Sequence, residues 1–258
     1  MRPARLLPLA TLTALALLTT ACGSGGDDDD TPAPVPPAPA TSPVSGAWQT
    51  TVAGGGAGHA IVLDDGTLWA LGTQASGQLV SQIHGSLQAS AGRLSASNVV
   101  YVDYTRNQFA RGSLSGTYVA GSSATIELTI PGTGSTGAQT YTPVPASTYT
   151  YNRAASLSDI SGTWQTTTGM RVTINASGAL EGSQNACRVT GTVAPHASGK
   201  NVFNLQVTFG AACPTPNQTL QGVAVTLGSG ASARLLATAL KDTGGDSVYS
   251  LSAVGTRS

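Results

Sequence analysis

The histidines and acidic residues of this 258-residue chain could do chemistry only if their spacing brought them together. The three histidines are dispersed and form no HExxH or other metal-binding pattern: His59, His84 and His196. Two pairs of acids are close in sequence, Asp64/Asp65 and Asp242/Asp246, and both lie beside glycine in turn-forming sequence. We therefore expect no metal, no cofactor and no enzyme activity.

Motifs for nucleotide binding and for a catalytic serine are not supported by their sequence context. Residues 132–137 read GTGSTG and match GxGxxG, but they follow Pro131 and lead into no helix that could hold a phosphate. We interpret them as a loop. No serine stands in a Gly-x-Ser-x-Gly elbow, so a hydrolase is the least favoured function class.

Cys187 and Cys213 are the cysteines of the main body. A metal pair and a nucleophile are the alternatives to a disulfide, but neither His nor an acid stands at ligand spacing, and Pro214 marks a turn. In an exported protein an even pair of this kind indicates a disulfide. Because the sequence between them is typical of a hairpin, both would lie at one rim of the same sheet.

Composition excludes other classes. The chain has 12 basic and 12 acidic residues, only 9% charged residues and 32 glycines. A nucleic-acid-binding protein would carry a basic face, so we expect no nucleic-acid partner. Abundant Gly, Ser, Thr and Val with little Glu, Lys or Met indicates an all-β protein.

The N-terminus has the features of an export signal. Residues 1–21 begin with Arg2 and Arg5, continue through a short apolar run, and end before Cys22. The segment resembles the signal of bacterial lipoproteins, in which such a Cys is acylated, although Thr19 stands where that family prefers Leu. The resemblance implies a lipid anchor at Cys22. Gly23, rather than Asp, follows that Cys, which is similar to lipoproteins that are sent to the outer membrane. The sequence does not specify which face of that membrane the protein occupies. An ordinary secretory signal is the alternative.

A tether follows the signal. Residues 22–43 contain an acidic run, Asp27–Asp30, and then a proline-rich stretch. We expect this linker to be disordered, with residues 32–43 extended over about 35–40 Å at ~3.1 Å per residue. It would hold the body away from the membrane surface.

The body contains an internal repeat. Val44–Thr51 and Ile160–Thr167 share the pattern Ser-Gly-x-Trp-Gln-Thr-Thr, and each copy ends in an alternating segment that finishes with Arg. The repeat predicts two domains, 44–154 and 155–258. Apolar and polar residues alternate within each copy, as at Phe203–Phe209, and turn signals separate the runs.

Strand counting favours closed barrels. The second copy contains eight predicted strands: 161–167, 170–175, 178–184, 186–194, 201–209, 219–228, 231–240 and 247–256. The first copy allows about as many, ending in a strand over 149–153. Eight short strands with tight turns are typical of an up-and-down antiparallel barrel, which removes exposed sheet edges. A β-sandwich is the alternative.

The repeated motif resembles a known superfamily. Gly46-Ala47-Trp48 and Gly162-Thr163-Trp164 are similar to the Gly-x-Trp motif on the first strand of the calycins, which include lipocalins and avidins. In those barrels an Arg from the last strand packs over the Trp ring and closes one end. The resemblance implies two pairs, Trp48 with Arg153 and Trp164 with Arg257.

These observations predict a binding or interaction module anchored to the outer membrane, with a small apolar ligand or a surface partner. The alternative is a structural or adhesive surface protein with filled barrels. An eight-stranded barrel can do either. The side chains expected to point inward leave the choice open: Ala124, Ile126, Leu128, Val223, Val225, Leu227, Leu235 and Ala237.

Overall fold

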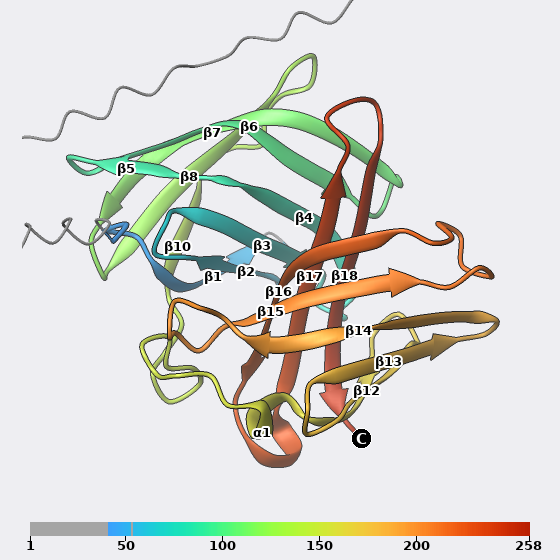
Figure 1. Ribbon diagram of the computed structural model, residues 1–258. Coiled ribbons are helices and arrows are strands. Elements are labelled where there is room, and N and C mark those ends of the chain that lie inside the picture. The colour runs from blue at the N-terminus through green and yellow to red at the C-terminus, as the bar shows by residue number, and fades with distance from the viewer. Residues whose placement is uncertain (1–40, 53) are drawn as a thin grey trace, which may run out of the picture. The chain divides into compact units, whose positions relative to one another are not determined.

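The computed structural model describes residues 41–52 and 54–258, all of which belong to one compact unit. Two closed antiparallel barrels of eight strands each follow one another along the chain (Figure 1). The helical elements in this part of the chain are α1 (Leu157–Ile160), between the barrels, and the 3-10 turn η1 (Gly230–Ser232). The predicted all-β fold of two tandem barrels is therefore confirmed.

The second barrel has up-and-down topology, each strand pairing with its neighbours in sequence. Its strands are β11 (Gly162–Thr166), β12 (Arg171–Ile174), β13 (Ala179–Gln184), β14 (Cys187–Pro195), β15 (Phe203–Phe209), β16 (Thr219–Leu227), β17 (Arg234–Asp242) and β18 (Val248–Arg257). The ring closes where β18 pairs with β11 and Arg257 lies opposite Trp164. All eight overlap the predicted runs, because turns and alternation are regular here.

The first barrel is less regular. Its eight ring strands are β1 (Gly46–Val52), β2 (Gly56–Val62), β3 (Thr67–Thr73), β4 (Leu79–Ser86), β6 (Arg93–Asp103), β7 (Gln108–Val119), β8 (Ser123–Ile130) and β10 (Gln139–Pro143). The ring closes through β10, which pairs with both β8 and β1. Two short strands lie off the ring: β5 (Gln88–Ser90) on β6 and β9 (Gly134–Ser135) on β8. The GTGSTG sequence thus forms a turn and β9, with no helix.

The predicted last strand of the first copy is wrong. Residues 149–153 form turns and irregular backbone, and the ring is closed instead by the earlier strand β10. The alternation of Tyr149 and Tyr151 has a different cause. Both side chains are buried in an apolar cluster outside the barrel, so alternation reports burial and not strand pairing.

Each barrel encloses its own core. Trp48, Val62, Leu94 and Leu128 belong to the core of the first barrel. Trp164, Ile174, Phe203 and Leu235 belong to that of the second. Burying alternate apolar residues on the inner face of a closed sheet is the main source of stability in such a fold.

A third apolar cluster joins the two barrels. It combines residues of the first barrel, such as Trp69 and Val100, with residues of the second, such as Val225 and Leu236. The strands β16 and β17 are therefore buried on both faces. A strand buried on both faces reads as a continuous apolar run, like Leu235–Ala237, and not as a simple alternation.

This cluster corrects part of the inward-facing set. Ala124 and Leu128 lie in the first core, with Ile126 partly buried against it, and Leu235 and Ala237 lie in the second core. Three predicted inward residues are wrong, because they contact the other barrel: Val223, Val225 and Leu227. A period of two cannot tell which face of a strand is inside when both faces are apolar.

The predicted signal 1–21, Cys22 and most of the linker 22–43 lie outside the described residues. Between the barrels, residues 144–161 contain the predicted boundary at 154/155. In the described part of the chain, no helix has the length and apolar character needed to cross a membrane.

Candidate functional site

The closed end of the second barrel is built as the sequence predicts. The Arg257 guanidinium lies 4.7 Å from the Trp164 ring centroid. Its Nη1 and Nη2 donate to the carbonyls of Ser161 (3.0 Å) and Asp159 (2.9 Å). The Trp164 indole N–H donates to the Ile160 carbonyl at 2.8 Å. The stacking on the ring and the two carbonyl acceptors compensate the partial burial of the guanidinium charge, while its buried Nε has no hydrogen-bond partner among the described residues.

The predicted contact between Trp48 and Arg153 in the first barrel does not form. Trp48 is buried and its indole N–H donates to the Val44 carbonyl at 2.9 Å, as in the second copy. Arg153 lies outside the barrel strands and forms an ion pair with Asp159 at 2.7 Å. Because β10 ends at Pro143, the last ring strand stops well before Arg153 and offers no Arg to cover Trp48.

The predicted disulfide is present. Cys187 and Cys213 are bonded, with their Cα atoms 4.4 Å apart. Cys187 begins β14, and Cys213 lies in the loop after β15, so the bond ties two neighbouring segments at the open rim of the second barrel. This is a structural role, and neither sulfur is free for metal binding or catalysis.

The first barrel contains a chamber of about 240 Å³ at the end opposite Trp48. Small residues form part of its wall. Thr50, Gly58, Gly72 and Ser81 lie in one cross-strand row through β1, β2, β3 and β4. A Cβ added at Gly58 would lie 2.7 Å from Thr50 Cγ2 and 3.3 Å from the Tyr141 hydroxyl oxygen. Glycine at this position therefore lets β2 pack closely against Thr50 and Tyr141, where a larger residue would clash.

Five polar side chains line this chamber: Ser81, Tyr101, Thr136, Gln139 and Tyr141. Tyr101 and Tyr141 line it among mostly apolar side chains, and neither hydroxyl has a hydrogen-bond partner among the described residues. Burial raises the pKa of both phenols; at Tyr101 the nearby Asp103 adds to the rise and Arg106 opposes it. Both hydroxyls remain protonated at neutral pH and can donate to a ligand.

The interior of the second barrel is nearly filled. Its cavity measures about 50 Å³. The cross-strand row that starts at Trp164 continues through Val172, Gly182, Val189 and Phe209. The corresponding row from Trp48 begins with two alanines, Ala60 and Ala70. A cavity of this size has room for water and for no drug-sized ligand.

A polar network lies within the contact between the barrels. Gln82, which is fully buried, donates from Nε2 to the Ala239 carbonyl at 3.3 Å and accepts from the Tyr104 hydroxyl at 2.7 Å. The Ser252 hydroxyl lies 2.9 Å from that of Tyr104. Gln82 and Tyr104 belong to the first barrel, and Ala239 and Ser252 to the second. Buried polar groups that are fully partnered fix one arrangement of the two surfaces.

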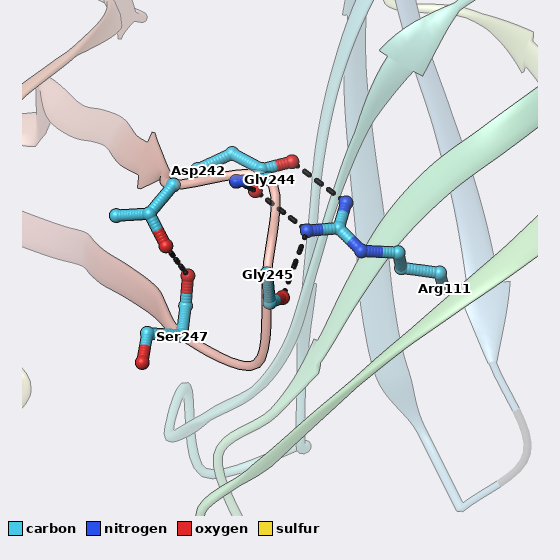
Figure 2. Close-up of polar contacts among 6 residues, drawn as sticks. Arg111, Asp242, Gly244, Gly245 and Ser247 are labelled. Atoms are coloured by element: carbon cyan, nitrogen blue, oxygen red, sulfur yellow. Dashed lines mark hydrogen bonds and ion pairs between the residues drawn. The ribbon is translucent and has the colours of Figure 1, made fainter.

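An ion pair stands at the edge of this contact. Figure 2 shows the Arg111 guanidinium from β7 facing the hairpin between β17 and β18. Its two terminal nitrogens donate to the two carboxylate oxygens of Asp242 at 2.7 and 2.6 Å. The hydrogen bond from Arg111, with help from the Gly244 N–H, lowers the pKa of Asp242 to about 2. Asp242 thus remains charged throughout the physiological range.

Two of the three histidines line the contact between the barrels. His84 stacks on Trp69 with ring centroids 3.8 Å apart, and its Nδ1 lies 3.0 Å from the Leu68 carbonyl. His59 borders a small cavity between the barrels, and its Nδ1 is buried without a partner among the described residues. Burial lowers the pKa of both imidazoles, and Arg234 lowers that of His59 further.

Nothing described assembles a metal centre. Within residues 41–52 and 54–258, no group of three or more His, Cys, Asp and Glu side chains is placed to hold a metal ion. His196 lies apart from the other two histidines and hydrogen-bonds Ser198 in its own turn.

Sequence reasoning missed the chamber and the contact between the barrels. The glycines and alanines of β2 and β3 were a usable signal, because they stand at inward positions where a filled barrel needs bulk. Tyr101 and Tyr141 gave none, because single tyrosines at strand positions do not show what they face. A scan against protein-family models finds no match for this chain, and a search of curated proteins finds none either.

Proposed function

We propose that this protein is a calycin-like lipoprotein of the outer membrane that works as a non-enzymatic binding module. The ligand would be a small, mainly apolar molecule with one hydrogen-bond acceptor, held in the first barrel. The observation that carries this proposal is the chamber of about 240 Å³ with two unpartnered tyrosine hydroxyls. Pockets for drug-sized ligands measure about 300–1,000 Å³, so the ligand would be smaller than these.

Each feature of the chamber supports the same ligand chemistry. Its walls are largely apolar, and no lining residue carries a formal charge, so an ion would lose its hydration without compensation. An acceptor atom on the ligand would satisfy Tyr101 or Tyr141. Gly58 and Gly72 line the chamber and add no side chain to it.

Native mass spectrometry tests the internal ligand. We expect protein purified as made to carry a small molecule that protein refolded after organic extraction lacks. Added acetophenone, a small neutral probe with a carbonyl acceptor, should rebind to the refolded protein. Ser81→Leu, which fills the chamber, should abolish binding, whereas Ser113→Leu on the exposed face of β7 should not. Ligand-free protein that also ignores the probe would refute the proposal.

The anchor has its own test. If Cys22 is acylated, then globomycin treatment or Cys22→Ala should leave the precursor uncleaved and remove the protein from the membrane fraction. Normal processing of that variant to a soluble form would contradict the lipoprotein assignment and leave the binding proposal unaffected.

A structural or adhesive protein is the second candidate. The filled interior of the second barrel favours it, because that barrel has no room for a ligand of its own. Under this alternative both barrels would present only their outer surfaces to a partner. Protein with an empty chamber that still attaches to cells or matrix would favour it.

A further inference from the structure

A large hollow lies outside both barrel interiors. It is a cleft of about 760 Å³ between the open rim of the second barrel and two turns of the first. The first barrel contributes Gln78, Leu79 and Tyr104, and the second contributes its rim, including the disulfide at Cys187. The cleft exists only because two barrels are joined in one chain, and its volume lies within the usual range of ligand sites.

Its walls are held in place before any ligand arrives. Tyr104 is fixed by its hydrogen bonds to Gln82 and Ser252. Gln184 donates from Nε2 to the Thr168 carbonyl at 2.6 Å, which joins two turns of the rim. The Cys187–Cys213 bond restrains the opposite side. A preorganised site spends little binding free energy on ordering itself.

No residue that lines the cleft is Asp, Glu, Lys, Arg or His. A charged ligand would therefore give up hydration without meeting an opposite charge. This argues for a ligand that is uncharged, although the cleft is open enough to admit larger molecules.

The polar groups of the cleft are amides and hydroxyls. Gln78, Asn185 and Thr215 have side chains without a hydrogen-bond partner among the described residues. Amides and hydroxyls both donate and accept, so they suit a ligand whose own groups do both. Phe209, Leu251 and Met170 add apolar surface beside them. Sugars combine these two properties, with hydroxyl groups at the edge of a ring and C–H groups on its faces.

We propose that the cleft between the barrels binds a neutral oligosaccharide. The side-chain amides of Gln78 and Asn185, one from each barrel, would hold its hydroxyl groups from two sides. This site is separate from the chamber of the first barrel and extends the binding role to a second ligand class. The two proposals can fail independently, because Ser81 lines the chamber and not the cleft, and Asn185 lines the cleft and not the chamber.

Nitrogen-edited NMR of the full-length protein tests the proposal through the side-chain amide signals. The sample would use a zwitterionic detergent without a sugar head group. Probes would be cellobiose, maltose and N,N′-diacetylchitobiose, with cellobiouronic acid as a charged comparison. We expect at least one neutral disaccharide to shift the amide signals of Gln78 and Asn185 at millimolar concentration, and the uronic acid to bind more weakly.

Asn185→Gly provides the matched variant. Asn185 has φ +52°, which glycine adopts readily, so the turn should persist while the amide is lost. We expect about tenfold weaker binding of the disaccharide. Asn217→Gly, at φ +60° and outside the cleft, should bind as the wild type does. No shift with any neutral probe, equal weakening in both variants, or tighter binding of the uronic acid would overturn the proposal.

Discussion

The two barrels begin with the same motif and close in different ways. Gly46 and Gly162 have φ +148° and +130°, and each following Trp donates its indole N–H to the carbonyl four residues earlier. In the second barrel a ten-residue last strand then brings Arg257 over Trp164. In the first barrel a five-residue last strand ends at Pro143 and covers Trp48 with no Arg.

The open ends differ as well. β1, β2 and β3 have seven residues each, whereas β11, β12 and β13 have five, four and six. The longer strands extend the first barrel beyond its core and line a chamber there, while the second barrel stops near its core and is tied by a disulfide. A shared closed-end motif therefore fixes the start of a barrel and leaves its depth to the length and bulk of the strands.

The largest effect should come from the disulfide, which only the second barrel has. Replacing both Cys187 and Cys213 by Ser should lower the free energy of unfolding by about 3 kcal/mol, because the bond closes a 26-residue loop. Urea unfolding followed by Trp164 fluorescence, with Trp48 and Trp69 replaced by Phe, would measure it. Wild-type protein under reducing conditions should match the variant. Two free thiols in native protein would contradict the assignment.

Substitutions of Arg257 and Arg153 give the next test, because only Arg257 covers the Trp at the closed end of its barrel. Arg257→Met should cost about 2 kcal/mol, since it removes two charge-assisted hydrogen bonds and the stacking on Trp164. Arg153→Met should cost less than about 0.5 kcal/mol, as expected for an exposed ion pair. Chemical unfolding of both variants checks the difference. Equal losses would mean that the closed ends do not differ as described.

A smaller effect is expected for the ion pair that joins the barrels. Asp242→Asn or Arg111→Met should each lower the free energy of unfolding slightly, because this is a surface ion pair in which each terminal nitrogen bonds one carboxylate oxygen. The double variant should lose little more than either single variant. Strictly additive losses in this double-mutant cycle would show that the pair contributes nothing.

The smallest effect, a dependence on pH, tests the contact between the barrels. The pKa values of His59 and His84 are lowered from 6.5 by burial, so the unfolded chain binds more protons than the folded one. The free energy of unfolding should reach its full value above about pH 6.5. It should fall as the pH decreases toward the pKa values that His59 and His84 have in the folded protein. Asp242 acts in a different window, since its contribution is lost only below its ordinary pKa of 3.8.

Unfolding measured between pH 8 and pH 5.5 would show the slope. A variant with Gln at both His59 and His84 should lose most of it. An unchanged slope in the double variant would place the titrating groups elsewhere.

Much of the fold was readable from local sequence. Turn residues and alternation located the eight strands of the second barrel, and the repeated Gly-x-Trp motif located the start of both. The disulfide followed from the cysteine pair and the hairpin between its members, and the Trp164–Arg257 contact followed from the resemblance to the calycins. The first copy was harder, since the short strand β10 has no strong alternation and Tyr149 and Tyr151 imitate a strand.

The sequence by itself determined that this chain is all-β, duplicated and closed around a Trp in each copy. Only the tertiary structure decided which face of β16 lies inside, where the first barrel closes, and that a cleft forms between the barrels. The physical reason is that hydrophobic patterning records burial without recording the partner. Val225 is as apolar against a neighbouring barrel as it would be inside its own, so the choice depends on contacts between residues far apart in sequence.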